Sequence, residues 1–457
     1  MANVTTAAGG PGSADDIVAR LERLPVSWWQ VKARIIVGVA TFFDAFDALA
    51  IATILPVIVP LWKLTPPQIG FMISAGFVGQ FIGALLFGWI AERYGRVTAM
   101  IWSIALFAVM SLVCAFAWDY NSLLVFRTIQ GIGLGGEVPV AAVFISELAK
   151  AKGRGRFVLL YELVFPIGLT GASLIALWVV PAFGWQWMFV IGALPAFLAL
   201  VLRSLLPESP RWLSVRGRAA EAEAAMTVIE NETQKATGQP LPPPQPVVAT
   251  LDKPASWADL FGPVYLRRTL VVWVIWFAAY FVNYGLSIWM PTLYRTLFKL
   301  PLDVSLRYGL ITQAVGLLGT LICALAIDHV GRRLWFALAF AGAAIALMSL
   351  ASFATPTAEQ VLTCVTIAYF FVSSINIGVY LYTPELYPTR ARAIAVGTAT
   401  AWLRFASIIG PSIVGMMIAG GLPSLFMLFG SVAALAAVIT AVFAVETKGR
   451  VLEEASP

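Results

Sequence analysis

Twelve long apolar segments constrain the fold of this 457-residue chain more than any other feature. A helix of about 18 or more apolar residues crosses the roughly 30 Å hydrocarbon core of a bilayer. Only 12% of the residues are charged and 60% are apolar, whereas soluble domains contain roughly 25% charged residues. We therefore exclude a soluble protein and predict an all-α integral membrane protein embedded in the lipid bilayer. The predicted spans are about 34–61, 68–91, 97–117, 122–145, 157–180, 186–206, 269–297, 305–327, 334–353, 359–383, 393–419 and 423–445.

The distribution of basic residues predicts how the chain is oriented in the membrane. Twelve spans put both termini on one side, and alternate assignment of the loops puts 24 of the 30 Lys and Arg residues on that side. Basic loops stay in the cytoplasm. Both termini of this multi-pass protein are therefore predicted to be cytoplasmic. The charges form no stripe, so no nucleic-acid partner is expected.

A polar insert between the sixth and seventh spans divides the chain into two halves. Its Ala- and Glu-rich middle, residues 218–235, predicts a helix, and the proline-rich residues 240–246 predict a semi-rigid linker. The expected parts are a cytoplasmic N-terminal segment (1–33), a first six-helix half (34–206), a cytoplasmic linker with helical segments (207–268), a second six-helix half (269–445) and a cytoplasmic tail (446–457).

Short charged patterns recur in both halves at nearly the same offset. Residues 92–96 (ERYGR) recur as 328–332 (DHVGR), residues 147–154 match 385–392 at their terminal Glu and Arg, and 207–209 (PES) recur as 445–447 (VET). A repeat of about half the chain length is typical of a duplicated transporter unit. We therefore predict that the two six-helix halves are parallel repeats.

Two of these patterns resemble signatures of the major facilitator superfamily. Residues 88–96 (GWIAERYGR) are similar to its signature between the second and third spans, with Glu92 in place of the usual Asp. Residues 127–137 (RTIQGIGLGGE) resemble its fourth-span signature. The resemblance covers essentially the whole chain, and it implies a transporter with twelve helices in two parallel halves.

Three further motifs narrow the resemblance. Residues 207–213 (PESPRWL), 384–390 (PELYPTR) and 446–450 (ETKGR) resemble those of sugar porters and of the organic-ion and synaptic-vesicle-protein-like branch. Within that branch the bacterial niacin (nicotinate) transporters are the most similar. The seventh span lacks the paired glutamines of sugar porters, and the loop near Lys63 is too short for animal organic-cation transporters. The resemblance therefore implies a carrier of small organic ions in a bacterial inner (plasma) membrane.

Repeated charges at the cytoplasmic helix ends predict a gating role. Acidic and basic side chains there can pair across neighbouring spans and bias the equilibrium between two arrangements of the bundle. They are not expected to bind the substrate. The predicted gating residues are Glu92, Arg93, Arg96, Glu147, Arg154, Glu208, Asp328, Arg332, Glu385, Arg392 and Glu446.

Ionisable residues inside the spans are the main functional candidates, because each costs roughly 2.5–3.5 kcal/mol at mid-helix. Asp44 and Asp47 are three residues apart and share a helix face, and Arg127 is their candidate counter-ion. These three are predicted to carry proton coupling. The alternative is a static buried pair of Asp47 with Arg127. Glu162 is interpreted as a helix-end charge.

Arg404, in the middle of the eleventh span, points to an anionic substrate. Its forked donors suit a planar carboxylate, and the resemblance implies that a basic residue in this region of the organic-ion branch favours anions. The alternative is a structural partner for backbone carbonyls or for Glu137. Aromatic and amide side chains in the seventh and tenth spans can hold a ring, although such stripes also serve packing. The predicted substrate-binding residues are Arg404, Tyr280, Asn283, Tyr284, Trp276, Asn376 and Glu137.

These features predict a proton-coupled secondary active transporter that imports a small aromatic carboxylate, nicotinate first, by alternating access. Open alternatives are a hydroxybenzoate-type carrier, an organic cation or drug exporter, and a receptor that does not transport. No nucleophile-plus-base pair, phosphate-binding loop or metal-ligand cluster appears, so neither an enzyme nor a cofactor or metal is expected. The expected partners are the organic acid, protons and lipid, and the chain is expected to be a monomer.

Overall fold

The computed structural model describes residues 12–25, 27–148, 161–244 and 257–449. Twelve helical segments in these ranges are long and apolar enough to cross a membrane, which confirms the predicted fold class. The first half contains α2 (Trp28–Trp62), α3 (Pro66–Tyr94), α4 (Arg96–Cys114), α5 (Tyr120–Leu148), α7 (Val164–Phe183) and the pair α8 (Gln186–Gly192) and α9 (Pro195–Leu205). The second half contains α12 (Leu266–Thr296), α13 (Leu302–Val330), α14 (Arg332–Ala351), α15 (Ala358–Glu385), α16 (Thr389–Met417) and α17 (Leu422–Phe443). Two 3₁₀ turns precede helices of this half: η1 (Trp257–Phe261) precedes α12, and η2 (Ile418–Gly420) precedes α17.

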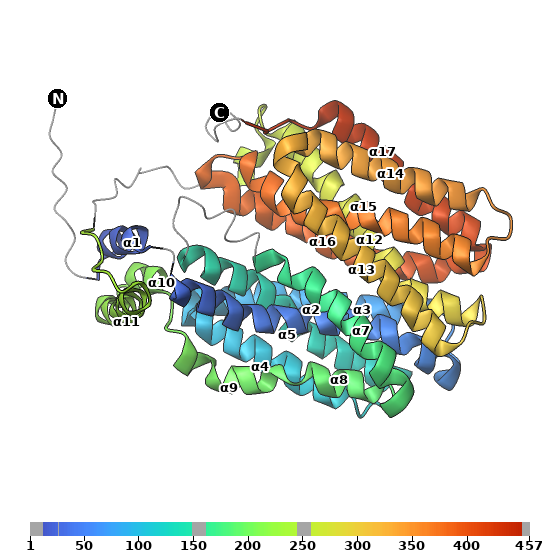
Figure 1. The fold of residues 1–457 in the computed structure, drawn as a ribbon, viewed down its shortest axis with the longest axis horizontal. Helices are drawn as coiled ribbons and strands as arrows, with labels where there is room; N and C mark the ends of the chain where they lie inside the picture. Colours follow the sequence, from blue (N-terminus) through green and yellow to red (C-terminus); the bar gives the residue numbers. More distant parts are fainter. Residues whose placement is uncertain (1–11, 26, 149–160, 245–256, 450–457) are drawn as a thin grey trace.

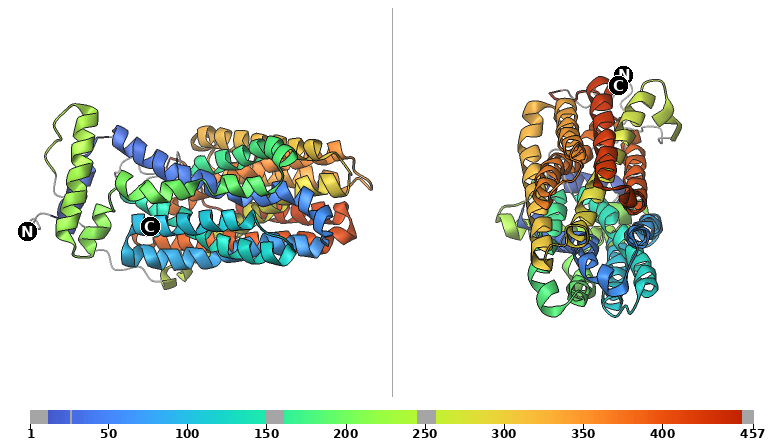
Figure 2. Two further views of the ribbon diagram at one scale, coloured as in Figure 1. Left: turned by 90° about the horizontal axis from the view of Figure 1, so that it is seen from below. Right: turned by 90° about the vertical axis from the view of Figure 1, so that its right-hand side faces the viewer.

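Three short helices outside the spans lie together at one end of the bundle, which we call the linker side (Figure 1). They are α1 (Ala14–Arg23), α10 (Pro210–Val215) and α11 (Ala219–Thr237), and α11 confirms the helix predicted over 218–235. Figure 2 shows α11 running across the ends of the spans. The indole nitrogen of Trp212 donates to the carbonyl of Glu92 at 2.9 Å, so α10 is fixed to the first half.

Glycines allow α3 and α5 to pack with their backbones in contact. A Cβ atom on Gly83 would lie 1.9 Å from the carbonyl oxygen of Ile132, and one on Gly135 would lie 2.0 Å from that of Gln80. Small residues at helix interfaces permit such close approach within a membrane. The rigid first half therefore depends on these positions, and α3 carries Gln80 to the interface with the second half.

The two halves meet on the side opposite α11, which we call the outer side. The hydroxyl of Ser74 donates to the carbonyl of Ile408 at 2.5 Å and lies 2.8 Å from the hydroxyl of Ser412. One apolar core runs from the second half into the outer part of the first half, whereas the linker-side part of the first half has a separate core. The described residues thus adopt a conformation that is closed on the outer side.

Candidate functional site

A cavity lies between the halves at mid-depth, with an empty volume of about 910 Å³ including its mouth. Small-molecule sites in proteins are commonly clefts lined by aromatic residues and a few polar groups. Both halves contribute to this cavity, and its lining includes residues from α2, α3, α7, α12, α13, α15 and α16. Of the residues predicted from the sequence, it brings together Asp44, Tyr280, Asn283, Tyr284, Asn376 and Arg404.

Arg404 of α16 and Asp44 of α2 place opposite charges on the cavity wall. The Nη1 of Arg404 donates to the side-chain oxygen of Gln80 on α3. Asp44 is 6% exposed, and its Oδ1 accepts no hydrogen bond. Asp44 and Arg404 attract each other, but they form no ion pair within the 4.0 Å that defines one among the described residues. A ligand carboxylate can therefore approach Arg404 without breaking a salt bridge.

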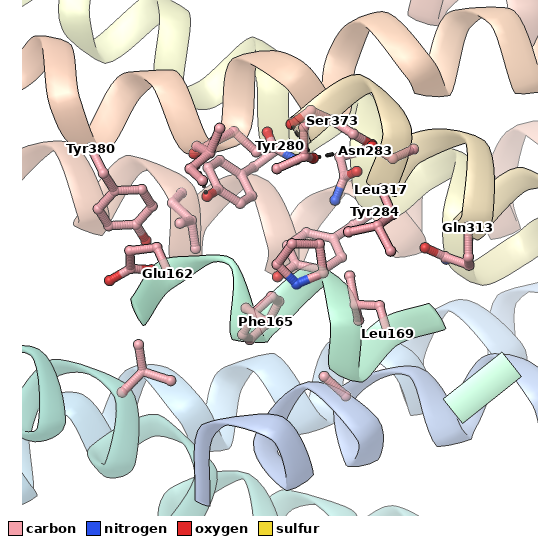
Figure 3. Close-up of a pocket in the computed structure, with 18 of the residues that line it drawn as sticks. Glu162, Phe165, Leu169, Tyr280, Asn283, Tyr284, Gln313, Leu317, Ser373 and Tyr380 are labelled. Atoms are coloured by element: carbon pink, nitrogen blue, oxygen red, sulfur yellow. Dashed lines mark hydrogen bonds between the residues drawn. The ribbon is translucent and has the colours of Figure 1, made fainter. Parts of the chain in front are cut away.

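Tyrosines from two helices of the second half form the aromatic wall of the cavity. Tyr280 and Tyr284 come from α12, one helical turn apart, and Tyr369 and Tyr380 come from α15. In Figure 3 the rings of Tyr280 and Tyr284 lie on the cavity side of their helix. The hydroxyl of Tyr369 donates to the side-chain oxygen of Gln313 at 2.8 Å, which fixes that ring. This wall offers flat surfaces with polar edges to an aromatic ligand.

Trp276 does not line the cavity, contrary to the prediction. Its ring stacks on Tyr280 at 5.8 Å and lies edge-on to Tyr380 at 4.7 Å. Its indole nitrogen donates to the hydroxyl of Thr383 at 2.9 Å. Trp276 is one turn closer to the linker side than Tyr280, where α15 packs against α12 and covers it, so it supports two wall residues from behind.

Several buried polar atoms of the wall have no hydrogen-bond partner. They are the Oδ1 atoms of Asn283 and Asn376 and the hydroxyl of Ser373. Buried polar groups in native proteins are almost always hydrogen-bonded, and an unpaired one costs roughly 1–3 kcal/mol. Because these groups converge on one cavity, they favour a ligand that carries polar atoms as well as a ring.

Asp47 and Arg127 form a buried ion pair outside the cavity. Arg127 Nη1 lies 3.0 Å from Asp47 Oδ2 and 2.9 Å from the side-chain oxygen of Gln130. Ser111 donates to Asp47 Oδ1 at 3.3 Å. Asp44 and Asp47 therefore do not both face the cavity, although they are three residues apart. A rotation of about 60° around α2 is enough to turn Asp47 toward α4 and α5 inside the first half.

Glu137 is also absent from the cavity wall, contrary to its predicted role in substrate binding. Its neighbour Val138 lines the cavity, whereas Glu137 points about 100° away around α5. The carboxylate is fully buried (0% exposed) and accepts a hydrogen bond from Thr41 of α2 at 3.1 Å. The hydroxyl of Thr41 also contacts that of Tyr161. Glu137 therefore belongs to the interior of the first half.

Glu162, interpreted from the sequence as a helix-end charge, lines the cavity. It precedes α7, and Figure 3 shows its carboxylate close to the ring of Tyr380 from the second half. The two residues lie on the linker side of Tyr280 and Tyr284. Because α7 and α15 belong to different halves, the distance between Glu162 and Tyr380 reports how the halves are arranged.

The predicted gating charges form one cluster in each half, with matching contacts. Arg96 pairs with Glu92 at 2.9 Å and with Glu147 at 3.0 Å, and its backbone nitrogen donates to Glu208 at 2.8 Å. These clusters join neighbouring helices within one half. Among the described residues these contacts link helices inside one half and do not cross between the halves. Arg154, the remaining predicted member, lies outside the described residues.

The second-half cluster repeats these contacts at the equivalent positions. Arg332 pairs with Asp328 at 2.7 Å and with Glu385 at 2.9 Å, and its backbone nitrogen donates to Glu446 at 2.9 Å. Two other predicted gating residues contact groups other than these carboxylates. Arg392 donates to the carbonyl of Pro384 at 2.8 Å, and the guanidinium of Arg93 lies 5.6 Å from the ring centre of Trp89.

Sequence reasoning missed several uncharged polar residues of the wall. Gln80, Gln313 and Thr320 each stand among apolar neighbours inside a predicted span. Polar residues inside a membrane segment usually face the bundle interior, so the same signal that selected the charged residues was available for these. Tyr369 and Tyr380 carried no such signal, because tyrosine also occurs where helices simply pack.

Comparison with known proteins supports the fold and the family. Residues 41–457 match the family model described as sugar (and other) transporter. The chain is 34% identical over 443 residues to a niacin transporter, NiaP, of Acinetobacter baylyi, covering 96% of this chain and 99% of the relative. It is 29% identical over 455 residues to the synaptic vesicle 2-related protein of Xenopus laevis, covering 95% and 82%. The xylose transporter XylE of E. coli, in a partially occluded inward-open conformation, superposes with a TM-score of 0.74 at 21% identity, covering 93% and 100%.

Proposed function

Since this chain belongs to the sugar (and other) transporter family of the major facilitator superfamily, we propose that it is a proton-coupled importer of a small aromatic carboxylate, nicotinate in the first place. The chain is a multi-pass membrane transporter of small molecules and not an enzyme. The finer assignment rests on one observation above all. A cavity between the halves combines a mid-membrane arginine with a wall of tyrosines and unpaired polar groups.

Arg404 is proposed to hold the substrate carboxylate. An arginine presents parallel N–H donors that match a planar carboxylate, and such charge-assisted bonds are the strong ones. One donor of Arg404 is already used by Gln80, which leaves the remaining face of the guanidinium for the ligand. The positive charge of Arg404 repels a cationic group placed beside it and attracts a carboxylate.

The aromatic ring of the substrate is proposed to lie against Tyr280 and Tyr284. Offset or edge-on contacts between aromatic rings contribute about 0.5–1.5 kcal/mol beyond burial. Asn283 and Asn376 can hydrogen-bond a ring nitrogen or a ring hydroxyl. The similarity to a protein named as a niacin transporter favours the ring nitrogen of nicotinate over the hydroxyl of a hydroxybenzoate.

Asp44 is the proposed site of the coupled proton. It shares the cavity with Arg404, whereas Asp47 is held by Arg127 and Ser111. A protonated Asp44 no longer offsets the positive charge of Arg404, which favours binding of the anion. One proton carried with one monoanion is electroneutral, so the pH gradient drives uptake. A net charge would instead add about 2.3 kcal/mol per 100 mV.

The linker side is proposed to face the cytoplasm of a bacterial cell, as the positive-inside rule predicts. The structure, closed on the outer side, then corresponds to a conformation from which substrate leaves to the cytoplasm. Each half would rock about the cavity in alternating access. A monomer is the proposed transporting unit, since both halves of one chain line the cavity.

The test is uptake of labelled nicotinate by proteoliposomes that contain the purified protein. We expect accumulation under an inward proton gradient and no response to membrane voltage alone. Arg404→Ala should weaken nicotinate binding by at least about tenfold, since bonds to charged groups contribute roughly 1.5–3 kcal/mol each. Arg404→Lys keeps the charge but loses the parallel N–H donors. Its nicotinate affinity should lie between those of Arg404→Ala and the unaltered protein.

Arg307→Ala is the matched control, because Arg307 is an exposed arginine at the start of α13 that pairs with Asp303 at 3.6 Å. It should bind nicotinate like the unaltered protein. Retained nicotinate affinity in Arg404→Ala would refute the carboxylate assignment. A panel with 4-hydroxybenzoate and the neutral amide of nicotinate would identify the ring substituents and the charge that the cavity prefers.

A further inference from the structure

A buried carboxyl group inside the first half is not used by the proposed substrate site. Glu137 of α5 is 0% exposed, and none of the described Lys or Arg side chains forms an ion pair with it. Arg127 stands ten residues earlier on the same helix, roughly 15 Å away. An isolated buried carboxylate is so costly that such a group takes up a proton instead. Glu137 is therefore neutral in this conformation.

Glu137 begins a chain of hydroxyl groups. Thr41 of α2 lies 3.1 Å from Glu137 Oε1 and 3.4 Å from Oε2. The Thr41 hydroxyl is also in hydrogen-bond contact with the hydroxyl of Tyr161. Every hydroxyl both donates and accepts, so the order carboxyl, Thr41, Tyr161 can pass a proton in either direction.

The two ends of this chain lead to different places. Tyr161 lines a mostly apolar groove on the outside of the bundle, near the linker-side ends of α2 and α7, and Arg34 is the charged residue among its described lining. At the other end, Asp44 stands three residues after Thr41 and so lies on the same side of α2, one turn farther toward the cavity. The titratable groups that face Glu137 are Asp44, Tyr161 and Glu162.

We propose that Glu137, Thr41 and Tyr161 form a proton path from Asp44 to the linker side, inside the first half and separate from the substrate's route through the cavity. The inference rests on the proposed function, because it gives Asp44 a way to release its proton while a bound substrate covers it. The separation follows from the geometry, since neither Glu137 nor Thr41 lines the cavity.

The transfer balances proton by proton. Glu137, which is protonated in this conformation, first gives its proton to the oxygen of Thr41, while Thr41 gives its own to Tyr161 and Tyr161 gives its own to the groove. The carboxylate left on Glu137 then takes the proton of Asp44 when one of these two side chains changes rotamer between α2 and α5. No charge other than this proton moves, and the electroneutral stoichiometry is unchanged.

Conservative variants in proteoliposomes test the path, with nicotinate as the probe. Glu137→Gln and Tyr161→Phe should each reduce nicotinate uptake driven by a pH gradient by about tenfold or more. Exchange of labelled for unlabelled nicotinate needs no net proton release, so it should stay within about twofold. Thr41→Val should lower uptake in the same way. Thr53→Val is its matched control, because Thr53 is a buried threonine of α2 whose hydroxyl donates to the carbonyl of Ala50.

The outcomes distinguish the possibilities. If both variants accumulate nicotinate on a pH gradient like the unaltered protein, Asp44 releases its proton through the cavity and the path does not exist. If Glu137→Gln loses exchange as well, Glu137 serves substrate binding or folding, which also contradicts the path.

If the unaltered protein does not bind nicotinate, the proposed substrate is wrong. Infrared difference spectra then test the protonation of Glu137 without any substrate. They should show a protonated carboxyl band at neutral pH that Glu137→Gln removes, and an unchanged band would overturn the proposal.

Discussion

At the scale of single residues, two aspartates one turn apart on α2 have different chemistry. Asp47 is fully buried in an ion pair with Arg127 and receives further hydrogen bonds, whereas Asp44 has an unpaired oxygen at the cavity wall. In a buried ion pair the attraction between the two charges roughly offsets the cost of removing them from water. Removal of one partner leaves the other charge buried without compensation. Asp47 therefore holds α2 to α5, while Asp44 remains free to change its protonation.

This difference predicts opposite stability effects. Asp47→Asn should destabilise the protein by about 3–5 kcal/mol, because Arg127 loses its counter-charge in the interior. Asp44→Asn should leave stability unchanged or raise it, since it removes an unpaired buried carboxyl. Thermal unfolding in detergent measures both variants. The double variant Asp47→Asn with Arg127→Gln is the control and should recover much of the loss, and equal melting temperatures for Asp47→Asn and Asp44→Asn would contradict the assignment.

The residue types in the sequence predicted part of the cavity lining. Which of the candidate residues face the cavity depends on how each helix is oriented about its own axis. Arg404 and Asp44 were found because a charge inside an apolar span is rare and costly. Glu137 and Trp276 satisfied the same reasoning but face the interior of their own half. The spans are apolar on nearly all sides, so the sequence carries no clear amphipathic pattern that fixes their rotation. Which side of a helix faces the cavity follows only from how the twelve helices pack.

At the scale of elements, the linker-side helices form a small unit on the first half. The apolar face of α1, with Ile17 and Leu21, packs into the core of that half together with Met226 and Ile229 of α11. Arg20 donates to Glu230 at 3.0 and 2.7 Å. The helical pattern of 218–235 was predictable from sequence, but its contact with α1 was not, because it joins segments about two hundred residues apart.

Glu230 should make the docking of α1 sensitive to acid. Burial raises the pKa of Glu230, but hydrogen bonds from Arg20 and Arg23 outweigh it and hold the pKa below its usual range. A lowered pKa stabilises the docked state above the usual value of about 4.3, and the stabilisation is lost as the pH falls through the lowered pKa. Docking should therefore persist at neutral pH and weaken only in acid below about pH 4.

A dye attached through Ala14→Cys on α1 measures this docking by its fluorescence anisotropy. Glu230→Gln should lower the anisotropy already at neutral pH and remove the acid transition. Glu232→Gln is the control, because Glu232 forms only an exposed pair with Lys235 at 3.6 Å, and surface pairs contribute about 0–1 kcal/mol. An acid transition that survives in Glu230→Gln would assign the effect to another carboxylate.

At the scale of the whole molecule, duplication explains why two distant clusters match. Arg96 and Arg332 each pair with an acid four residues earlier and with the acid near the end of the fourth helix of their half. At Gly95 and Gly331 the backbone also approaches a third acid closely, Glu208 in the first half and Glu446 in the second. The sequence predicted this correspondence because the charges repeat. The cavity lies between the repeats and is asymmetric, so Arg404 has no equivalent in the first half.

The contact between the halves on the outer side predicts that a cross-link there stops transport. The hydroxyl oxygens of Ser74 on α3 and Ser412 on α16 are 2.8 Å apart, which is close enough for a disulfide after Ser74→Cys and Ser412→Cys. Alternating access requires these helices to separate, so the oxidised protein should lose net uptake and regain it on reduction. Nicotinate should still bind to the locked protein from the linker side, because the cavity is not altered.

The two single-cysteine variants are the controls and should transport under oxidising conditions. The native cysteines do not compete for the cross-link, since Cys114 and Cys323 are buried and Cys364 is half-buried. Uptake that continues after complete disulfide formation would mean that substrate crosses without separation of α3 from α16. Loss of nicotinate binding in the locked protein would instead mean that the cavity opens toward the outer side, which contradicts the conformation inferred from the contacts between the halves.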